Sequence, residues 1–468
     1  MSDWLRGRSR ADRALAAITL LGLVLRVGYV LLHRDLPVEG DGEGYYWSGR
    51  FLADGHGFVS SSAFRMHHDA TLSAAADHPP GWILVFGALA LLGVQRILWF
   101  QLVAAVIGTA TVAAVGVAGR RIAGPRVGLL AAGIAAVYPN LWMYERVLLC
   151  ETPAILLAAL TIGATYRFRE HPTTRGAAVL GLLVGLLTMV RPEALLVGVL
   201  AAPVIWLLRD VPARRRLQWT AVAGAVAVAP IVPWAAYNTA RFEAPVVLTT
   251  NLGHTIVSSN CDAAYYDGEI GWWDYGCLED ATRGAPADAA VRDRELQSMA
   301  FDYMRSHTRR FVTVVLAREG RTFGLYKPFE QVRLESLGGP TEGVLRAGLL
   351  AYWPLALLAV AGVVVLRRRR VPVAPLVGFV GTVAIAAGLT IGQIRYRALA
   401  EVPIVLLAAV AVDALATPLR HPAGPAPTAG ATPGGDDGHR DAADGRPTGA
   451  RRAIPASYAP ALSASGMV

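Results

Sequence analysis

The chain has 468 residues, of which 54% are hydrophobic and 17% are charged, and its net charge is +9. A soluble protein carries roughly a quarter charged residues, so this composition excludes an ordinary soluble domain. Most arginines form short clusters between apolar runs, so the positive charge does not indicate a nucleic-acid partner. The apolar runs are often about 20 residues long, enough to cross a bilayer core of about 30 Å. We therefore predict an all-α polytopic membrane protein.

Arginine clusters predict the orientation of the chain. Basic residues precede the first apolar run, roughly 14–32, which places the N-terminus inside and makes this run a retained span. The later clusters, all expected in the cytoplasm, are Arg120-Arg121 with Arg126, Arg167 with Arg169, Arg214 to Arg216, and Arg367 to Arg370. The run 81–93 is short for a span and would put Arg120 outside if it crossed. We predict that it is a re-entrant or interfacial helix on the outer face.

The remaining apolar runs give about ten spans with both chain ends inside. After the first span they lie at about 95–119, 127–142, 147–166, 176–191, 194–209, 217–236, 345–366, 372–391 and 397–415. Two large outer segments, 33–80 and 238–343, connect them. Residues 416–468 are rich in Pro, Gly, Ala, Thr and Asp and have no apolar period, so we predict a disordered cytoplasmic tail after the membrane domain of residues 1–415.

Ionisable residues gather at the predicted outer face. Asp41, Glu43 and His78 lie in the first outer segment, and the outer turns between spans carry further charges: Glu145, Arg146, Glu151, Arg191, Glu193, Arg395, Arg397 and Glu401. Ionisable groups at the bilayer boundary are costly, and they usually pair with each other or line a cavity. Pairing at the interface would explain any one of these residues. The whole set predicts a polar cavity that is open to the outside and suited to a hydroxylic, phosphorylated substrate.

Four stretches, in this order, resemble the GT-C membrane glycosyltransferases. They are VEGDGEGYYWSGRFLADGHGF (38–58), ADHPPGW (76–82), PWAAYNTARFEAPVVLTTNLGHTIVSSNC (233–261) and RYRALAEVPIVLLAA (395–409). The resemblance covers most of residues 14–415 and is closest to the bacterial branch related to protein O-mannosyltransferases and lipid A aminoarabinose transferases. It implies a GT-C-like bundle, a polyprenyl-phosphate sugar as donor, and an active site on the outer face of the plasma membrane.

The resemblance matches Asp41 to the catalytic acid of the family, with Glu43 two positions further on. A carboxylate within hydrogen-bond reach can take the proton of an acceptor hydroxyl, so we expect Asp41 to be the general base. The family's x-Pro-Pro element helps to hold the donor phosphate, and this chain has His78 there, where lysine is common. Guanidinium groups bind phosphate with two hydrogen bonds, so Arg395 and Arg397 are predicted to act with His78. Three more residues complete the predicted substrate-binding set: Glu151, Arg191 and Tyr396.

No metal site or cofactor is predicted. His56, His67, His68, Asp69 and His78 do not have the spacing of a familiar ligand pattern, and a solvated loop explains them better. The chain also lacks a C-x-x-C pair. Asp41 and Glu43 could coordinate a divalent cation, but the resemblance does not imply a need for one. The expected partners are the lipid-linked donor, membrane lipids and an acceptor that is a protein, a lipid or a polysaccharide. The sugar, a hexose or a pentose, stays open.

Residues 272–276 read Trp-Trp-Asp-Tyr-Gly, the signature pentapeptide of oligosaccharyltransferases. In those enzymes the pentapeptide lies in a soluble domain after the last span and recognises the acceptor sequence. Here it lies between the seventh and eighth predicted spans, so we interpret it as a chance match with a structural role. Cys261 and Cys277 flank it on the oxidising side of the membrane, and we predict that they form a disulfide. Cys150 lies in an apolar run and is expected to be a free, buried thiol.

Two other kinds of protein would fit part of this pattern. A transporter or flippase of lipid-linked sugars would also have about ten spans and buried charges, but we find no paired repeats or broken helices. A scaffold subunit with a decayed site is disfavoured by the intact Asp41. The sequence therefore predicts an enzyme that transfers a sugar from a polyprenyl phosphate to an acceptor hydroxyl.

Overall fold

The structure, a computed structural model, describes residues 10–61, 72–201 and 203–416. The described residues form helices and no strand, apart from one isolated bridge between Val59 and Ala74. The predicted all-α class is confirmed. The predicted tail, from residue 417 onward, and His67, His68 and Asp69 lie outside the described residues.

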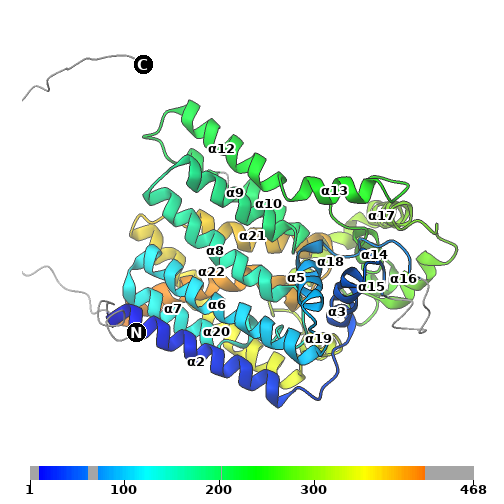
Figure 1. Cartoon of the computed structure of the whole chain (residues 1–468), viewed down its shortest axis with the longest axis horizontal. Helices are drawn as coiled ribbons and strands as arrows, with labels where there is room; N and C mark the ends of the chain where they lie inside the picture. The colour runs from blue at the N-terminus through cyan, green and yellow to red at the C-terminus, as the bar shows by residue number, and fades with distance from the viewer. Residues whose placement is uncertain (1–9, 62–71, 202, 417–468) are drawn as a thin grey trace, which may run out of the picture. The chain divides into compact units, whose positions relative to one another are not determined.

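Helices occupy all ten positions predicted for spans (Figure 1). They are α2 (Arg10–Leu32), α6 (Ile97–Ala123), α7 (Pro125–Val137), α8 (Glu151–Glu170), α9 (Thr174–Thr188), α10 with α11 (Leu195–Ala201 and Pro203–Trp206), α12 with α13 (Ala213–Val228 and Ile231–Thr239), α20 (Glu342–Arg368), α21 (Ala374–Leu389) and α22 (Ala398–Ala416). Among the described helices, four are long and apolar enough to cross a bilayer by length and composition, or five if the bent pair α12–α13 is one span. The count of ten therefore stays a prediction.

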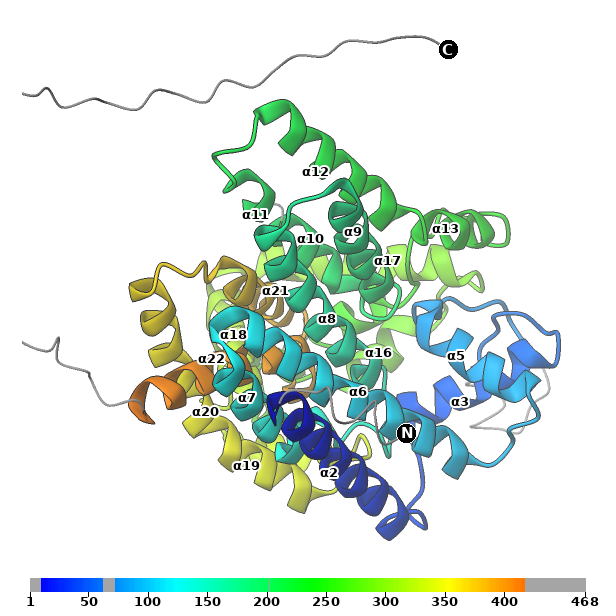
Figure 2. The same cartoon turned by 60° about the vertical axis from the view of Figure 1, so that its left-hand side comes forward.

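The helices of the two predicted outer segments gather, together with the helix of the run 81–93, at one end of this bundle, on the right in Figure 1. They are α3 (Gly40–Ala53), α5 (Pro80–Leu91), α14 (Leu252–Val257), α15 (Asp262–Tyr266), α16 (Tyr275–Thr282), α17 (Ala289–Ser306), α18 (Thr308–Thr322) and α19 (Pro328–Ser336). Helix α5 has 12 residues, which span about 18 Å at 1.5 Å per residue and are too few to cross a bilayer core. It packs beside α3 (Figure 2). A short helix therefore lies where we predicted a re-entrant one.

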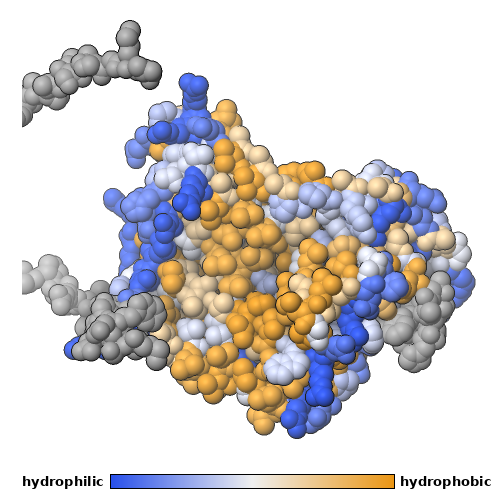
Figure 3. All heavy atoms as spheres, in the orientation of Figure 1, coloured by the Kyte–Doolittle hydropathy of each residue, from blue (hydrophilic) through white to orange (hydrophobic). Residues whose placement is uncertain are grey.

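The turns that carry arginine clusters lie at the opposite end of the bundle. Arg120 and Arg121 are in the last turn of α6, Arg167 and Arg169 are in the last turn of α8, and Arg367 is in the last turn of α20. Figure 3 shows a hydrophobic band over the helices between hydrophilic surfaces at the two ends. This distribution is that of a membrane protein. The prediction that the basic end faces the cytoplasm stays a prediction.

Helix α22 forms the centre of the bundle. Its residues from Ala398 to Ala411 are all buried, and it packs against α20, α7, α8 and α21. A helix that is apolar on every side is stable only when neighbours surround it. Gly362 of α20 allows α20 and α22 to pack closely, because a Cβ at this position would lie 2.1 Å from the carbonyl oxygen of Leu407. Small residues at such crossings are typical of helix pairs in membranes.

One buried ion pair fastens the first helix to this bundle. Arg26 of α2 is fully buried and donates to Glu145 at 2.8 Å, in the turn before α8. It also donates to the carbonyls of Ala135 and Ala136 at the end of α7. A charge inside a membrane helix is costly unless it is paired, so these contacts explain Glu145 as a structural residue. Arg146 is likewise structural, because it donates to the carbonyls of Pro37 and Gly339.

The helix pair α12–α13 bends by 43°. Pro230 stands at the junction and cannot donate a backbone hydrogen bond, which breaks the helix there. No broken helix was expected from the sequence, and this expectation was wrong. The signal was present, since Pro230 and Pro233 lie inside the run predicted as one span.

Cysteine labelling on intact cells tests the topology. We expect a membrane-impermeant maleimide to label Arg283→Cys, whose side chain is 74% exposed in the second outer segment, but not Arg120→Cys. The native thiols give little background, because Cys150 is buried and the other two cysteines are bonded. Outside labelling at residue 120 would contradict the arginine distribution and would make α5 a true span.

Candidate active site

Asp41 lies in the first turn of α3, where two glycines shape the chain. Gly40 has a φ of +62°, a left-handed conformation that glycine adopts without strain. At Gly42 a Cβ would lie 1.8 Å from the carbonyl oxygen of Val147. Only glycine allows α3 to lie so close to the turn before α8. The close approach is made to protein backbone, and it brings Asp41 next to the start of α8.

Arg395 joins Asp41 to Glu151. It lies in the short 3-10 helix η3 (Ile394–Arg397), 354 positions after Asp41, and its Nη2 donates to Asp41 Oδ2 at 2.6 Å. Its Nε lies 3.4 Å from Glu151 Oε1. His78 Nε2 lies 4.0 Å from the other oxygen of Asp41. The structure therefore brings four of the residues predicted from the sequence into one cluster.

A second guanidinium lies on the far side of Glu151. Arg191, just before the 3-10 helix η2 (Pro192–Ala194), donates to Glu151 Oε1 at 2.7 Å and to Glu193 at 2.6 Å. It also lies 5.0 Å from the ring centroid of Tyr396, a cation–π contact. Among the described residues, Arg191 Nη2 and Arg395 Nε are buried and lack a hydrogen-bond partner. Buried donors are rarely left unsatisfied, so these two atoms could donate to a bound anion.

Exposure decreases from Asp41 inward. The side chains of Asp41, Arg395 and His78 are 36%, 25% and 24% exposed, whereas that of Arg191 is 5% exposed and that of Glu151 is fully buried. A substrate can therefore reach Asp41 and Arg395 directly. Glu151 lies behind them and can act only by holding the two guanidinium groups.

The structure does not place Arg397 in this cluster, and helix geometry separates Glu43 from Asp41. Glu43 follows Asp41 by two residues in α3, which turns its side chain about 200° around the helix axis. Arg397 is fully buried and donates to Glu401 at 2.7 Å, and Tyr138 donates to the same carboxylate at 2.8 Å. Its guanidinium also lies 3.6 Å from the ring centroid of Tyr352. Arg397 therefore anchors η3 to α22.

Glu335 also belongs to the site, although it was not predicted from the sequence. This residue of α19 accepts the backbone N–H of Ile394 at 2.6 Å and the side-chain amide of Gln331 at 3.1 Å. Burial raises the pKa of Glu335 to about 7, and the nearby guanidinium of Arg395 opposes this shift. The only sequence signal was an acid on the face of α19 that carries Val332 and Leu334.

The pentapeptide packs behind the same loop. Trp272 is buried against Leu334 and Ile391, and Tyr396 packs on this cluster. Gly392 donates its N–H to the carbonyl of Gly271 at 3.0 Å. Asp274 is the N-cap of α16 and accepts the N–H of Cys277 at 2.9 Å. The pentapeptide therefore supports the segment that carries Arg395, and its acid is occupied as a helix cap.

The predicted cysteine states are confirmed. Cys261 and Cys277 form a disulfide, with Cα atoms 6.4 Å apart, and Cys150 is free and buried. The Cys150 thiol lies 3.8 Å from Glu151 Oε2. The described residues contain no group of three or more His, Cys, Asp or Glu side chains that could hold a metal ion. The expectation of a metal-free site stays a prediction.

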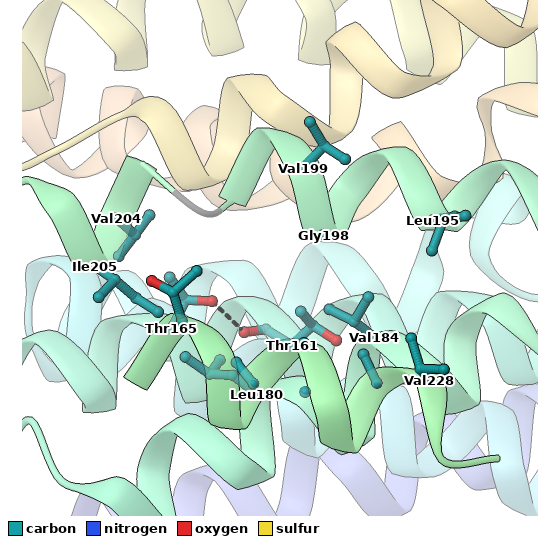
Figure 4. A pocket seen from close by; sticks show the side chains of 15 residues that line it. Thr161, Thr165, Leu180, Val184, Leu195, Gly198, Val199, Val204, Ile205 and Val228 are labelled. Carbon is teal, nitrogen blue, oxygen red and sulfur yellow. Dashed lines mark hydrogen bonds between the residues drawn. The ribbon is translucent and has the colours of Figure 1, made fainter. Parts of the chain in front are cut away.

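An apolar cavity of about 220 Å³ lies among α8, α9, α10, α11 and α12 (Figure 4). Its walls include Val184, Leu195, Val199 and Val228, of which the last three are exposed on the hydrophobic band. The hydroxyls of its threonines bond within their own helices, as Thr165 of α8 donates to the carbonyl of Thr161 at 2.7 Å and Thr220 of α12 donates to the carbonyl of Arg216. The cavity therefore offers a ligand an apolar surface. Leu195 follows Arg191 by four residues, so the same segment links the cavity to the charged cluster.

The fold is similar to that of solved membrane glycosyltransferases of the GT-C type, in agreement with the resemblance found in the sequence. An oligosaccharyltransferase of Archaeoglobus fulgidus, solved in the apo form, matches with a TM-score of 0.51 and 13% identity, over 87% of this chain and 51% of that one. The same archaeal enzyme, AglB, in complex with an inhibitory peptide and a dolichol-phosphate matches with a TM-score of 0.52 and 16% identity, over 86% and 50%. The chain thus spans about half the length of these enzymes.

Two further similarities cover a poorer structural match and a part of the sequence. ArnT from Cupriavidus metallidurans bound to undecaprenyl phosphate has a TM-score of 0.40 and 15% identity, over 85% of this chain and 77% of that one, which adds nothing to the fold assignment. Residues 77–237 match the family model described as dolichyl-phosphate-mannose-protein mannosyltransferase. No curated protein sequence matches the chain.

The capping role of Asp274 predicts the effect of its removal. Asp274→Ala is expected to lower the free energy of unfolding by about 1 kcal/mol and to leave glycosyl transfer largely intact. Asp274→Asn is the matched control, because asparagine is an equally good N-cap. Thermal unfolding and a transfer assay measure the two effects. A folded Asp274→Ala protein that transfers as poorly as an Asp41 variant would place the acceptor against this loop.

Proposed function

We propose that this protein is a glycosyltransferase of the plasma membrane that moves a sugar from a polyprenyl phosphate to an acceptor hydroxyl on the outer face. The observation that carries the proposal is the partly exposed Asp41 carboxylate, which lies 2.6 Å from Arg395. Arg395 and Arg191 each have one buried N–H group without a hydrogen-bond partner. The match of residues 77–237 to a mannosyltransferase family model supports the reaction class. The dolichol-phosphate in the archaeal structure of the same fold supports the lipid class of the donor.

Asp41 is the proposed general base. It takes the proton of the acceptor hydroxyl while that oxygen forms a bond to the anomeric carbon of the sugar. The bond between this carbon and the phosphate oxygen breaks, and its electron pair leaves with the polyprenyl phosphate. The ion pair with Arg395 holds the Asp41 carboxylate in place before the reaction. When the donor phosphate binds, Arg395 has a second anion to contact, and this frees an oxygen of Asp41 for the acceptor.

Arg395, Arg191 and His78 are the proposed phosphate ligands. Charge develops on the phosphate as the bond breaks, and fixed cationic donors stabilise that charge best when they need no rearrangement. Glu151 provides this fixation, because its buried Oε1 lies 2.7 Å from Arg191 and 3.4 Å from Arg395. The ring of Tyr396 packs against the guanidinium of Arg191 and restricts its movement. The assignment of Arg397 to the phosphate is replaced by a role in anchoring η3.

The apolar cavity is the proposed site of the polyprenyl tail. It begins near Leu195, four residues from Arg191, and is exposed on the hydrophobic band at Val199 and Val228. A lipid tail could therefore enter from the bilayer while its phosphate contacts the arginines. Burial of each CH₂ group contributes about 0.8 kcal/mol, so a tail held here would add substantially to donor affinity.

A flippase of lipid-linked sugars is the second candidate. The bent pair α12–α13 favours it, because broken helices are typical of transporters. The two functions differ in chemistry, since a flippase moves the lipid and leaves its sugar bond intact. Release of polyprenyl phosphate from a labelled donor by the purified protein distinguishes them.

Asp41→Asn is expected to lower the rate of transfer by about 10² to 10⁴ while the donor still binds. The amide has nearly the same shape as the carboxylate but cannot take the proton. Glu43→Gln is the matched control, with a smaller loss expected, because Glu43 lies about 200° from Asp41 around the axis of α3. Transfer is measured with purified variants and polyprenyl-phosphate sugars. An Asp41→Asn protein with more than about a tenth of the wild-type rate would exclude Asp41 as the base, and loss at Glu43 alone would exchange the roles.

Filling the cavity tests the site of the tail. A Cβ at Gly224 meets nothing within 4 Å, so the side chain of Gly224→Leu can enter the cavity without strain. We expect the KM of a long-chain donor to rise roughly tenfold, the equivalent of about two lost CH₂ contacts, with little change for a short-chain donor. Gly133→Leu is the control, because Gly133 also has open space but lies in α7, away from the cavity. Equal effects on both donors would contradict the assignment.

A further inference from the structure

Glu335 lies at the junction between α19 and the arginine loop. Its carboxylate is 8% exposed, and Oε1 accepts the N–H of Ile394, the residue before Arg395. Gln331, one turn earlier, donates to the same oxygen through its side-chain Nε2, and its side-chain Oε1 accepts from Arg321 of α18 at 3.0 Å. Arg321 in turn donates to the carbonyl of Ile270 at 2.7 Å. Glu335 is therefore held rigidly and fixes the backbone at the start of η3.

The cluster around Arg395 has more acids than bases. Asp41, Glu151 and Glu335 lie near its guanidinium, and Glu193 pairs with Arg191. Among the described residues, two arginines thus face four carboxylates. A donor phosphate would add another negative charge at the same guanidinium groups. Charge in a partly buried site is costly, so its arrival favours the protonation of one carboxylate.

Glu335 is the acid of this cluster that is best placed to take that proton. Asp41 and Glu151 each have a guanidinium within 2.7 Å. Among the described residues, the donors at hydrogen-bond distance from Glu335 are neutral: a backbone N–H and an amide. Protonation of its second oxygen leaves Oε1 free to accept the N–H of Ile394. The loop therefore stays in place in both protonation states.

We propose that Glu335 is a positioning residue that fixes the Arg395 loop and takes up a proton when the donor phosphate binds. This inference rests on the proposed function, because it needs a phosphate at Arg395. The groups that face Glu335 are Arg395 from η3, Glu151 from α8 and Tyr144 from the turn before α8. Arg321 of α18 reaches it through Gln331.

The sign of the pH effect follows from linkage. Burial raises the pKa of Glu335 from its ordinary value to about 7, and a phosphate anion nearby would raise it further. The bound state then holds more protons than the free state between these two pKa values. Affinity for the phosphate should therefore be highest below pH 7 and should fall as the pH rises above about 7, by up to tenfold per pH unit for one proton.

The test measures binding of a farnesyl methyl phosphodiester to the purified full-length protein between about pH 5.5 and about pH 8.5, the range around the pKa in question. A diester carries one charge throughout this range, so the probe itself does not titrate. Titration calorimetry in buffers of different ionisation enthalpy counts the protons taken up. The wild-type protein is expected to take up a proton on binding near pH 7.5 and to bind more weakly at higher pH.

Two variants separate proton uptake from positioning. Glu335→Gln imitates the protonated form and keeps an oxygen for the Ile394 N–H. It is expected to bind the diester without proton uptake, with an affinity that no longer falls above pH 7. Glu335→Leu removes the oxygen as well and should bind weakly at every pH. His78→Gln is the control for the other side chain beside Asp41 that could take up a proton. It should retain proton uptake by Glu335.

The outcomes distinguish this inference from the proposed function. Equal pH dependence in wild type and Glu335→Gln would refute proton uptake by Glu335, although the diester binds. Weak binding by Glu335→Gln at every pH would show that the residue is only structural. If no protein binds the diester at any pH, the donor class itself is wrong and the inference fails with it.

Discussion

The buried carboxylate of Glu151 is the contact on which the arrangement of the site depends. It is fully buried at the first residue of α8, and its Oε1 is shared by Arg191 and Arg395. Two guanidinium groups so close together repel each other, and a single anion between them offsets that repulsion. The loops before η2 and at η3 are therefore held together by one oxygen atom. The same oxygen keeps both arginines in place near Asp41.

The surrounding fold supplies rigidity from several directions. Arg397 fastens one end of η3 to Glu401 in the central helix, and Glu335 holds the other end by its first backbone N–H. The disulfide-bonded loop with Trp272 packs behind Tyr396. Residues of the disulfide-bonded loop, of α19 and of α22 thus converge on four residues of 3-10 helix. Such support is what a site needs when charge must be stabilised without rearrangement.

The membrane helices could be predicted from the sequence because their signals are local. Apolar runs and arginine clusters gave every helix position, although Pro230 should also have predicted the break between α12 and α13. The site was predicted in part. Asp41 came from the family resemblance, and Arg395 from its place at an outer turn. Arg397 looked equivalent to Arg395, but a 3-10 helix turns about 120° per residue and points it elsewhere. Glu335 could not be predicted, since its partner is the backbone of a segment 59 positions away.

Gly42 shows how a residue without a functional group can set the limits of sequence change in this protein. A Cβ at this position would lie 1.8 Å from the Val147 carbonyl oxygen, far inside van der Waals contact. Any substitution must move α3 and Asp41 away from Arg395 by more than the tolerance of a hydrogen bond. A displacement of about 1 Å can cost a catalytic site about 10²-fold in rate. Evolution can therefore vary the surface of α3 freely but has a single choice of amino acid beside the proposed base.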